Sequence, residues 1–258
     1  VQSVHDYREQ MPRIGSRKLY VLLKQDFGSQ PGFPGRDKFL DLLSEKGLLL
    51  RIKRRRRYKT TDSNHPYKRY PNLIRDRLFS APNQAWASDI TYIETTEGVC
   101  YLSLITDLYS RKIVGWALGR TLQTVYCVNA LRMALEQLHS PGLIHHSDRG
   151  CQYCSYDYVN CLKSHGIKIS MTESGDPLEN AVAERVNGII KSEWLYGVEI
   201  KDYTDCYERV SQAIRAYNTI RPHMSLDYQT PSQVHDQGAI PKRQWKTFKE
   251  RMEQRVAM

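Results

Sequence analysis

The feature that most constrains the fold is an alternation of strand-like and helix-like segments between residues 86 and 194. Three runs rich in β-forming side chains predict consecutive strands at residues 86–93, 99–106 and 112–118. The apolar spacing that follows predicts, in order, a helix at 124–138, a strand at 143–146, a helix at 156–164, a strand at 167–171 and a helix at 180–194. This order indicates one α/β domain of roughly 150 residues.

Three acidic side chains interrupt this pattern in a way that points to metal chemistry. Asp89 lies inside a strand-forming run, where a buried carboxylate is costly unless it is paired or binds a cation. Asp148 directly follows the fourth predicted strand, where a strand end presents its side chain to a cleft. Glu184 lies on the polar face of the last helix with Asn187, while Glu193 is the exception on its apolar face. Each acid alone also fits a turn, a cap or a solvated helix face, but together they are oxygen ligands that suit Mg²⁺.

Positive charge is concentrated at the two ends of the chain. Residues 1–80 have a net charge of +11, residues 81–240 of −5 and residues 241–258 of +4, which makes the total +10. Such asymmetry indicates basic arms around a different kind of domain and a polyanionic partner. The densest basic run, residues 51–59 (RIKRRRRYK), fits either a nucleic-acid backbone contact or a solvated linker.

The N-terminal part is predicted to be helical. Apolar spacing predicts short helices at residues 16–27 and 36–46, separated by a loop rich in Gly and Pro. The pair is either a helix-turn-helix variant that docks on DNA or a small packing module. No apolar run approaches the roughly 18 residues that span a bilayer, and the start of the chain is too polar for a signal peptide, so we expect an intracellular protein without a membrane partner.

Three sequence blocks, WASDITYI, HSDRGCQY and ENAVAERVNGIIKSEW, resemble the signature blocks of bacterial insertion-sequence transposases of the integrase-like DDE type. The match is to the second-frame (OrfB) protein of such elements. As in that family, 35 residues separate Asp148 from Glu184, and a basic residue, Lys191, follows seven positions later. Residues 12–23 and 217–234 resemble the family's N-terminal and C-terminal blocks.

Both the resemblance and the order of the predicted elements imply an RNase H-like (integrase-type) catalytic core with a small helical, helix-turn-helix-like N-terminal region. We expect a DNA-binding region with the basic run at 1–59, a linker at 60–80, the catalytic core at 81–235 and a basic tail at 236–258. The implied activity is transposition: metal-dependent cleavage at the element's ends, followed by transfer of the freed strand to another DNA.

The resemblance also implies the site residues and partners. Asp89, Asp148 and Glu184 would be the catalytic residues and metal ligands, holding two Mg²⁺ ions or, alternatively, Mn²⁺. The expected DNA contacts are Lys191, Asn187, His146, Arg54, Arg55, Arg56 and Arg57. The partners would be the insertion-sequence ends, the target DNA, further copies of this chain and the first-frame (OrfA) protein. The place of action would be the bacterial cytoplasm, at the nucleoid when DNA is bound.

Several alternatives stay open at the level of sequence. Glu179 is a rival acid, although its spacing of 31 positions from Asp148 does not fit the family. Cys151, Cys154 and Cys161 allow a metal clip, but free thiols in a reducing cytosol are the default.

Other polar residues have structural or DNA-binding interpretations. Asp107 fits a hairpin turn. His146 either orients Asp148, touches DNA or packs within its strand, and Arg221 and His223 either contact DNA or bond locally. The rival functions are a DNA-binding regulator that has lost the chemistry, and an RNase H-like nuclease that cuts without joining.

Overall fold

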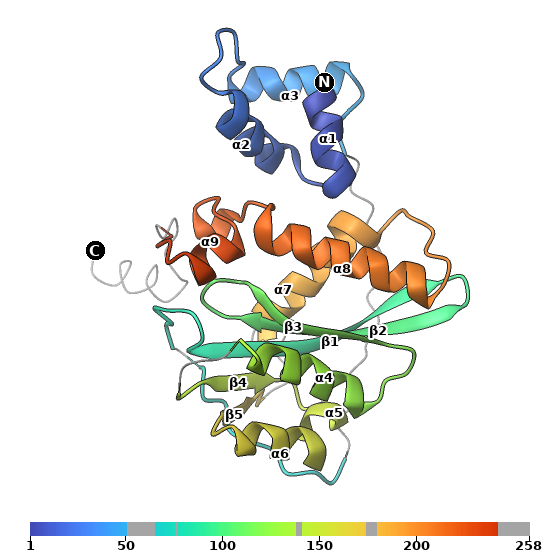
Figure 1. The fold of residues 1–258 in the computed structure, drawn as a ribbon, viewed down its shortest axis with the longest axis vertical. Helices are drawn as coiled ribbons and strands as arrows, with labels where there is room; N and C mark the ends of the chain where they lie inside the picture. Colours follow the sequence, from blue (N-terminus) through green and yellow to red (C-terminus); the bar gives the residue numbers. More distant parts are fainter. Residues whose placement is uncertain (51–64, 76, 138–140, 174–179, 242–258) are drawn as a thin grey trace, which may run out of the picture.

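The computed structural model describes residues 1–50, 65–75, 77–137, 141–173 and 180–241. A helical N-terminal module lies on one side of an α/β domain, at the top of the view in Figure 1. The runs of β-forming residues and the helical spacings identified in the sequence all become strands and helices at nearly the predicted positions.

A five-stranded mixed sheet forms the centre of the α/β domain. Its strands follow the order β3-β2-β1-β4-β5. The first three pair antiparallel, and β4 and β5 are added parallel to β1. This meander followed by two crossovers confirms the predicted RNase H-like fold. The bounds are β1 (Ala85–Thr95), β2 (Gly98–Asp107), β3 (Ile113–Gly119), β4 (Ile144–Ser147) and β5 (Lys168–Met171).

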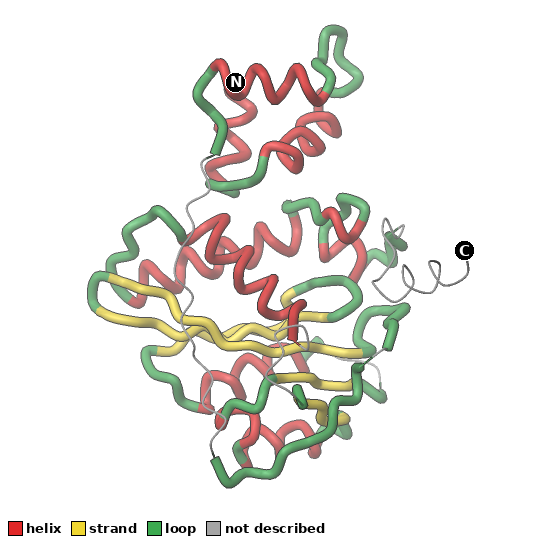
Figure 2. Tube along the Cα trace, turned by 180° about the vertical axis from the view of Figure 1, so that it is seen from behind, coloured by secondary structure: helices red, strands yellow, loops and turns green. Residues whose placement is uncertain are grey.

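Helices cover both faces of the sheet, as Figures 1 and 2 show. Because successive strand residues point to opposite faces, Leu104 joins one hydrophobic core and Ile105 the other. One face carries α4 (Thr124–Leu135), α5 (Cys151–Cys154) and α6 (Tyr156–Ser164). The opposite face carries α7 (Ala181–Ile190) and α8 (Tyr203–Thr219), followed by η3 (Met224–Leu226) and α9 (Pro231–Asp236).

The N-terminal module consists of α1 (Gln2–Gln10), α2 (Ser16–Phe27) and α3 (Arg36–Glu45). It attaches to the α/β domain through η2 (Lys191–Leu195), a π-helical turn that continues α7. The Trp194 indole donates to the Gln10 carbonyl at 2.8 Å, and the Arg13 backbone N–H donates to the Glu193 carbonyl at 3.0 Å. The module and the helix that carries Glu184 are therefore joined directly.

Glu193, the acid on the apolar side of the predicted helix, is the centre of a buried ion network. Its carboxylate accepts hydrogen bonds from Arg221 at 2.6 and 2.7 Å and from Lys18 at 2.8 Å. Arg221 is only 2% exposed and also bonds the His223 ring at 3.0 Å. Burial and the Arg221 charge hold the pKa of His223 well below its usual value, so the ring stays neutral. Of the two open interpretations of Arg221 and His223, the structure supports local bonding.

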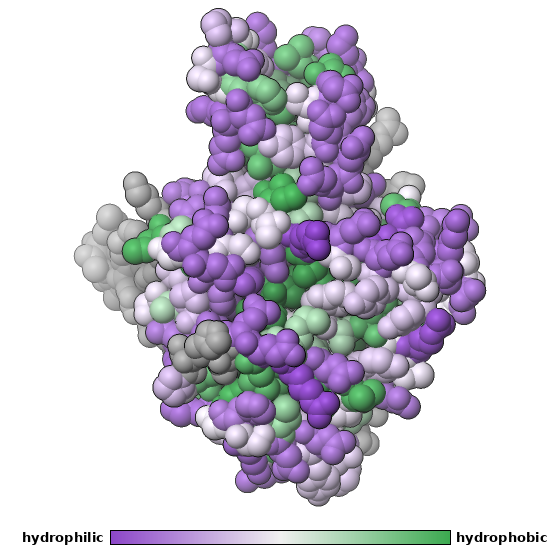
Figure 3. Space-filling view, viewed as in Figure 1, coloured by the Kyte–Doolittle hydropathy of each residue, from purple (hydrophilic) through white to green (hydrophobic). Residues whose placement is uncertain are grey.

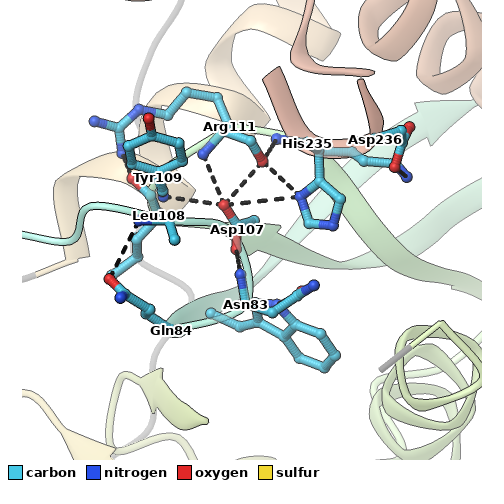
Figure 4. A network of polar contacts seen from close by, with 12 residues as sticks. Asn83, Gln84, Asp107, Leu108, Tyr109, Arg111, His235 and Asp236 are labelled. Carbon is cyan, nitrogen blue, oxygen red and sulfur yellow. Dashed lines mark hydrogen bonds and ion pairs between the residues drawn. The ribbon is translucent and has the colours of Figure 1, made fainter. Parts of the chain in front are cut away.

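Asp107 ends β2 and organises the turn into β3, as predicted (Figure 4). Its buried carboxylate accepts backbone N–H groups from Asn83 at 2.7 Å and from Tyr109 and Ser110 at 3.1 and 2.7 Å. The Ser110 hydroxyl donates to the same carboxylate at 2.8 Å and contacts the His235 ring at 2.8 Å. The cluster thereby fixes α9 to the β2–β3 turn.

Part of the predicted linker packs against the sheet. The backbone N–H of Leu73 donates to Ser170 of β5 at 2.8 Å, and Arg75 forms a 2.8 Å ion pair with Glu173. Tyr67 and Tyr70 lie against the core on the α4–α6 side. Residues 65–75 thus run along the β5 edge, while residues 60–64 lie outside the described part of the chain.

The surface is mixed in character. Figure 3 shows a face that is mostly hydrophilic, with hydrophobic side chains reaching the surface near its middle. Within the described residues, no helix combines the length and apolar character needed to cross a lipid bilayer.

Candidate active site

The pairing of β1 with β4 brings two of the predicted acids together. β4 runs parallel to β1 with Ala87 opposite His146, and the ladder ends there. Asp89 follows Ala87 by two residues, and Asp148 follows His146 by two residues. The two aspartates therefore occupy equivalent positions just beyond the last paired residues of β1 and β4. Both side chains line one cleft of about 410 Å³. The register of the two parallel strands therefore places both aspartates side by side where β4 ends, about halfway along β1.

Asp89 is in an electrostatically unfavourable position for an anion. Burial, the charge of Asp148 and, to a smaller extent, the charge of Glu184 raise the pKa of Asp89 to about 7. Only the 2.8 Å hydrogen bond from the Asn187 amide and a backbone bond oppose this shift. The carboxylates are thus close enough to repel one another, and a bound cation would turn that repulsion into attraction.

Glu184 approaches the aspartate pair from α7 but stands apart from it. It lies in the first turn of the helix, is exposed, and is not among the residues that line the cleft. Across the described ranges, no three His, Cys, Asp or Glu side chains are gathered tightly enough to hold one metal ion. The rival acid Glu179 belongs to residues 174–179, which are outside the description.

The turn after β4 fixes Asp148. Its Oδ1 accepts the backbone N–H of Gly150 at 3.0 Å. A Cβ at position 150 would lie 3.1 Å from that same oxygen and 3.3 Å from Oε1 of Gln152. A larger residue there would push the Asp148 carboxylate or the Gln152 side chain aside by a few tenths of an ångström, so glycine leaves the carboxylate in its place.

A divalent cation fits this donor set. Asp89 and Asp148 lie side by side where β4 ends, and their carboxylates supply hard oxygen ligands. The Asn187 amide orients the Asp89 carboxylate through its hydrogen bond. Burial and the charge of Asp148 raise the pKa of Asp89, and a bound cation would oppose both effects.

The residues predicted to contact DNA fall into three groups. Asn187 is 4% exposed and His146 is fully buried, with its ring bonded to Ser170 at 2.8 Å. These two side chains have internal positions in place of the expected surface contacts: Asn187 supports Asp89, and His146 packs between neighbouring strands. Lys191 is half-buried, with its ammonium 4.7 Å from the Tyr92 ring centre. Arg54, Arg55, Arg56 and Arg57 lie outside the described residues.

The cysteines near Asp148 are free thiols. Cys154 is buried against Met171, and Cys151 and Cys161 are half-buried. The neighbouring His145 is held between Ser88 and Tyr158 at 2.7 and 2.8 Å, and burial lowers its pKa to about 3. The structure gives the metal-clip interpretation no support in the described part of the chain.

Sequence reasoning did not identify the apolar side of the cleft. Ile90, Tyr92, Val99, Tyr101 and Leu122 line it next to the two aspartates. In the sequence they read as ordinary strand or loop residues, because only the pairing of β1 with β2 shows which of them share a face.

Comparisons with known proteins identify the family of the chain. Two family models, both described as integrase core domain, match residues 80–177 and 165–231. The insertion element IS600 uncharacterized 31 kDa protein of Shigella sonnei is 39% identical over 202 residues, which are 77% of this chain and 74% of that protein. The transposase for insertion sequence element IS904 of Lactococcus lactis is 36% identical over 182 residues, covering 66% and 72%.

A solved structure supports the fold. The simian T-cell lymphotropic virus intasome, in complex with a PP2A regulatory subunit, contains a chain that matches 91% of this one, with 75% of that chain covered. The TM-score is 0.54 at 17% sequence identity, so the likeness concerns the fold alone.

Proposed function

This chain belongs to the insertion-sequence transposases that carry an integrase core domain, and from that membership we propose that it cuts and joins DNA at the ends of an insertion sequence. The observation that carries the proposal is the parallel register that sets Asp89 beside Asp148 in one cleft. Two neighbouring carboxylates repel each other when both are ionised, and DNA binding alone does not require such a pair.

The catalytic roles go to Asp89, Asp148 and Glu184. Asp89 and Asp148 would hold divalent cations, Mg²⁺ or Mn²⁺, with Glu184 completing the set from α7. When bound, a pair of such ions activates the attacking oxygen and stabilises the leaving one in an in-line displacement. Asn187 keeps the Asp89 carboxylate oriented through its 2.8 Å hydrogen bond. The Gly150 backbone does the same for Asp148.

DNA would be held by the basic ends of the chain and by the rim of the cleft. We assign phosphate contacts to Lys191, which is half-buried at the start of η2, and to the run Arg54–Arg57. The division into a DNA-binding N-terminal region, a catalytic core and a basic tail is part of this proposal. Assembly of several copies on paired DNA ends, and cooperation with a first-frame (OrfA) protein, follow from the resemblance to the OrfB family.

A strand-transfer assay tests the function. Duplex DNA with the terminal sequences that flank this gene is incubated with the protein and Mg²⁺, and cut and joined products are separated on a denaturing gel. Wild type should yield both products, whereas Asp148→Asn and Glu184→Gln should bind DNA and yield neither. Glu97→Gln, which alters an exposed acid at the β1–β2 turn, is the matched control.

The outcomes separate three functions. Binding without cutting by wild type would overturn the proposal in favour of a regulator. Cutting without joining would overturn it in favour of a nuclease. Full activity of Glu184→Gln would remove that residue from the site while leaving the transposase assignment intact.

A further inference from the structure

The loop after Asp148 is held from two sides at a single peptide unit. The carbonyl of Arg149 and the backbone N–H of Gly150 belong to this unit, which is planar and trans. Its N–H donates to Oδ1 of Asp148 at 3.0 Å, and its carbonyl oxygen lies 2.7 Å from Nε2 of His65. The C=O and N–H bonds of a trans peptide point in opposite directions, so His65 and Asp148 lie at opposite ends of the unit.

The hydrogen bond between His65 and Arg149 has only one possible direction. A carbonyl oxygen can only accept, so Nε2 of His65 carries the proton and donates it. The other ring nitrogen, Nδ1, is buried and has no hydrogen-bond partner among the described residues. The polar contact that orients the ring is therefore the one with the Arg149 carbonyl.

Aromatic neighbours hold the His65 ring in place. Its centre lies 5.3 Å from that of the Tyr67 ring, which meets Tyr156 of α6 edge to face at 5.6 Å. Tyr67 also packs against the hydrophobic core, and residues 65–75 are bonded to β5, the strand next to β4. His65 thus reaches the Asp148 loop from a segment that is itself attached to the sheet.

The bond from His65 fixes the direction in which the Gly150 N–H points. If the peptide unit turned over, its carbonyl oxygen would face the Asp148 carboxylate, and the two would repel each other. A hydrogen bond at the carbonyl also polarises the amide, which strengthens the N–H···O bond at the other end. His65 therefore acts on Asp148 through the backbone, without touching the carboxylate.

We propose that His65 is a positioning residue for metal binding by Asp148, acting through the peptide unit between Arg149 and Gly150. This inference rests on the proposed function, in which Asp148 holds a divalent cation. Groups that orient a metal ligand typically change metal affinity or activity by about 10- to 100-fold when they are removed. The segment that follows the basic run would then support the active site as well as connect two parts of the chain.

Two substitutions of equal side-chain length separate the hydrogen bond from the volume of the side chain. His65→Gln keeps an N–H donor near the position of Nε2, whereas His65→Met fills a similar space without a donor. His165→Met alters an exposed histidine at the end of α6 and is the matched control.

Binding of Mg²⁺ alone tests the inference without DNA. Mg²⁺ is titrated into the full-length protein, and the rise in melting temperature gives the concentration for half-saturation. This concentration should be about 10-fold higher in His65→Met and within about 2-fold of wild type in His65→Gln and His165→Met. An unchanged value in His65→Met would overturn the inference. Equal weakening in His65→Met and His65→Gln would overturn it too, because the effect would then not depend on the donor.

The amide signal of Gly150 reports on the peptide unit directly. Protein labelled with ¹⁵N-glycine has 15 labelled residues, and the signal that is missing in Gly150→Ala belongs to Gly150. In metal-free His65→Met, the Gly150 proton should resonate further upfield and exchange faster with solvent, because its hydrogen bond is weaker. His65→Gln should keep the signal near its wild-type position. An unchanged Gly150 signal in His65→Met would refute the action through the backbone.

Strand cutting separates this inference from the proposed function. His65→Met should need about 10-fold more Mg²⁺ than wild type for half-maximal cutting, and excess Mg²⁺ should restore most of the rate. If wild type cuts and joins, Asp148→Asn does neither, and His65→Met has the Mg²⁺ requirement of wild type, the positioning role fails while the function stands. If wild type neither cuts nor joins, the proposed function fails, and the Mg²⁺ titration and the Gly150 signal still decide the role of His65.

Discussion

Replacing Asp89 by Asn should stabilise the metal-free protein at neutral and alkaline pH. Burial and the charges of Asp148 and Glu184 raise the pKa of the Asp89 carboxyl to about 7, from a usual value of 3.8. Asparagine has nearly the same shape, carries no charge, and its Oδ1 can still accept the 2.8 Å hydrogen bond from Asn187. The substitution therefore removes an unfavourable charge while keeping the contact.

The sign and size of the effect follow from proton linkage. The folded chain retains the Asp89 proton up to about pH 7, whereas the unfolded chain releases it near pH 4, so wild type loses stability as the pH rises between these values. A pKa difference of about three corresponds to about 4 kcal/mol. Because Asp89 is half-buried and lines a cleft that is open to solvent, water screens part of this cost, and about 2–3 kcal/mol is expected. The gain in the variant should be absent below about pH 4 and complete above about pH 7.

Urea unfolding in the presence of EDTA measures the effect. Wild type, Asp89→Asn and the exposed-site control Glu97→Gln are compared near pH 4 and pH 8. Added Mg²⁺ should then raise the unfolding midpoint of wild type more than that of Asp89→Asn, because the variant has lost a ligand. The reasoning would be refuted if Asp89→Asn were less stable than wild type near pH 8. It would also be refuted if the variant gained as much stability near pH 4 as near pH 8.

Three further predictions concern the supporting contacts. Glu193→Gln leaves the buried Arg221 guanidinium without its counter-charge and should lower the unfolding free energy by about 3–5 kcal/mol in urea titrations, with no loss in the exposed control Glu97→Gln. Gly150→Ala places a methyl group 3.1 Å from an Asp148 oxygen and should slow strand cutting about 10-fold or more, while the melting temperature stays near that of wild type. Asp107→Ala removes the acceptor of several buried N–H groups and should cost about 3 kcal/mol or more in thermal unfolding; an unchanged melting temperature would contradict that role.

The five strands of the α/β domain and its helices α4, α6 and α7 were predictable because their side-chain patterns are local, whereas α5, α8 and α9 were not predicted. The β-branched and aromatic runs mark β1 and β2, and the two-faced spacing marks α7. By contrast, α1 was missed because only Val4 of its nine residues is buried, so it has little apolar periodicity. The π-helical turn η2 was read as part of the preceding helix, since a change of helix type leaves no trace in an apolar pattern.

The candidate site was only partly predictable. The acids could be identified as costly departures from their patterns, but their relation depends on the register of β1 and β4, which pairs residues 59 positions apart. The same limit explains why Asn187 and His146 were wrongly expected to contact DNA. Both are polar side chains near the acids in the sequence, yet the packing of α7 and β5 turns them inward.

The attachment of the N-terminal module to η2 has a geometric consequence. Arg13, Lys18 and Trp194 fix the module to the end of the helix that begins beside Glu184. The stretch between these two points is one α-helix and one helical turn, a rigid rod of set length. A DNA sequence read by the module would therefore be cut at a constant number of base pairs from the sequence itself. Under the proposed function, the junction would set this spacing, and inserting residues into it would move the cut.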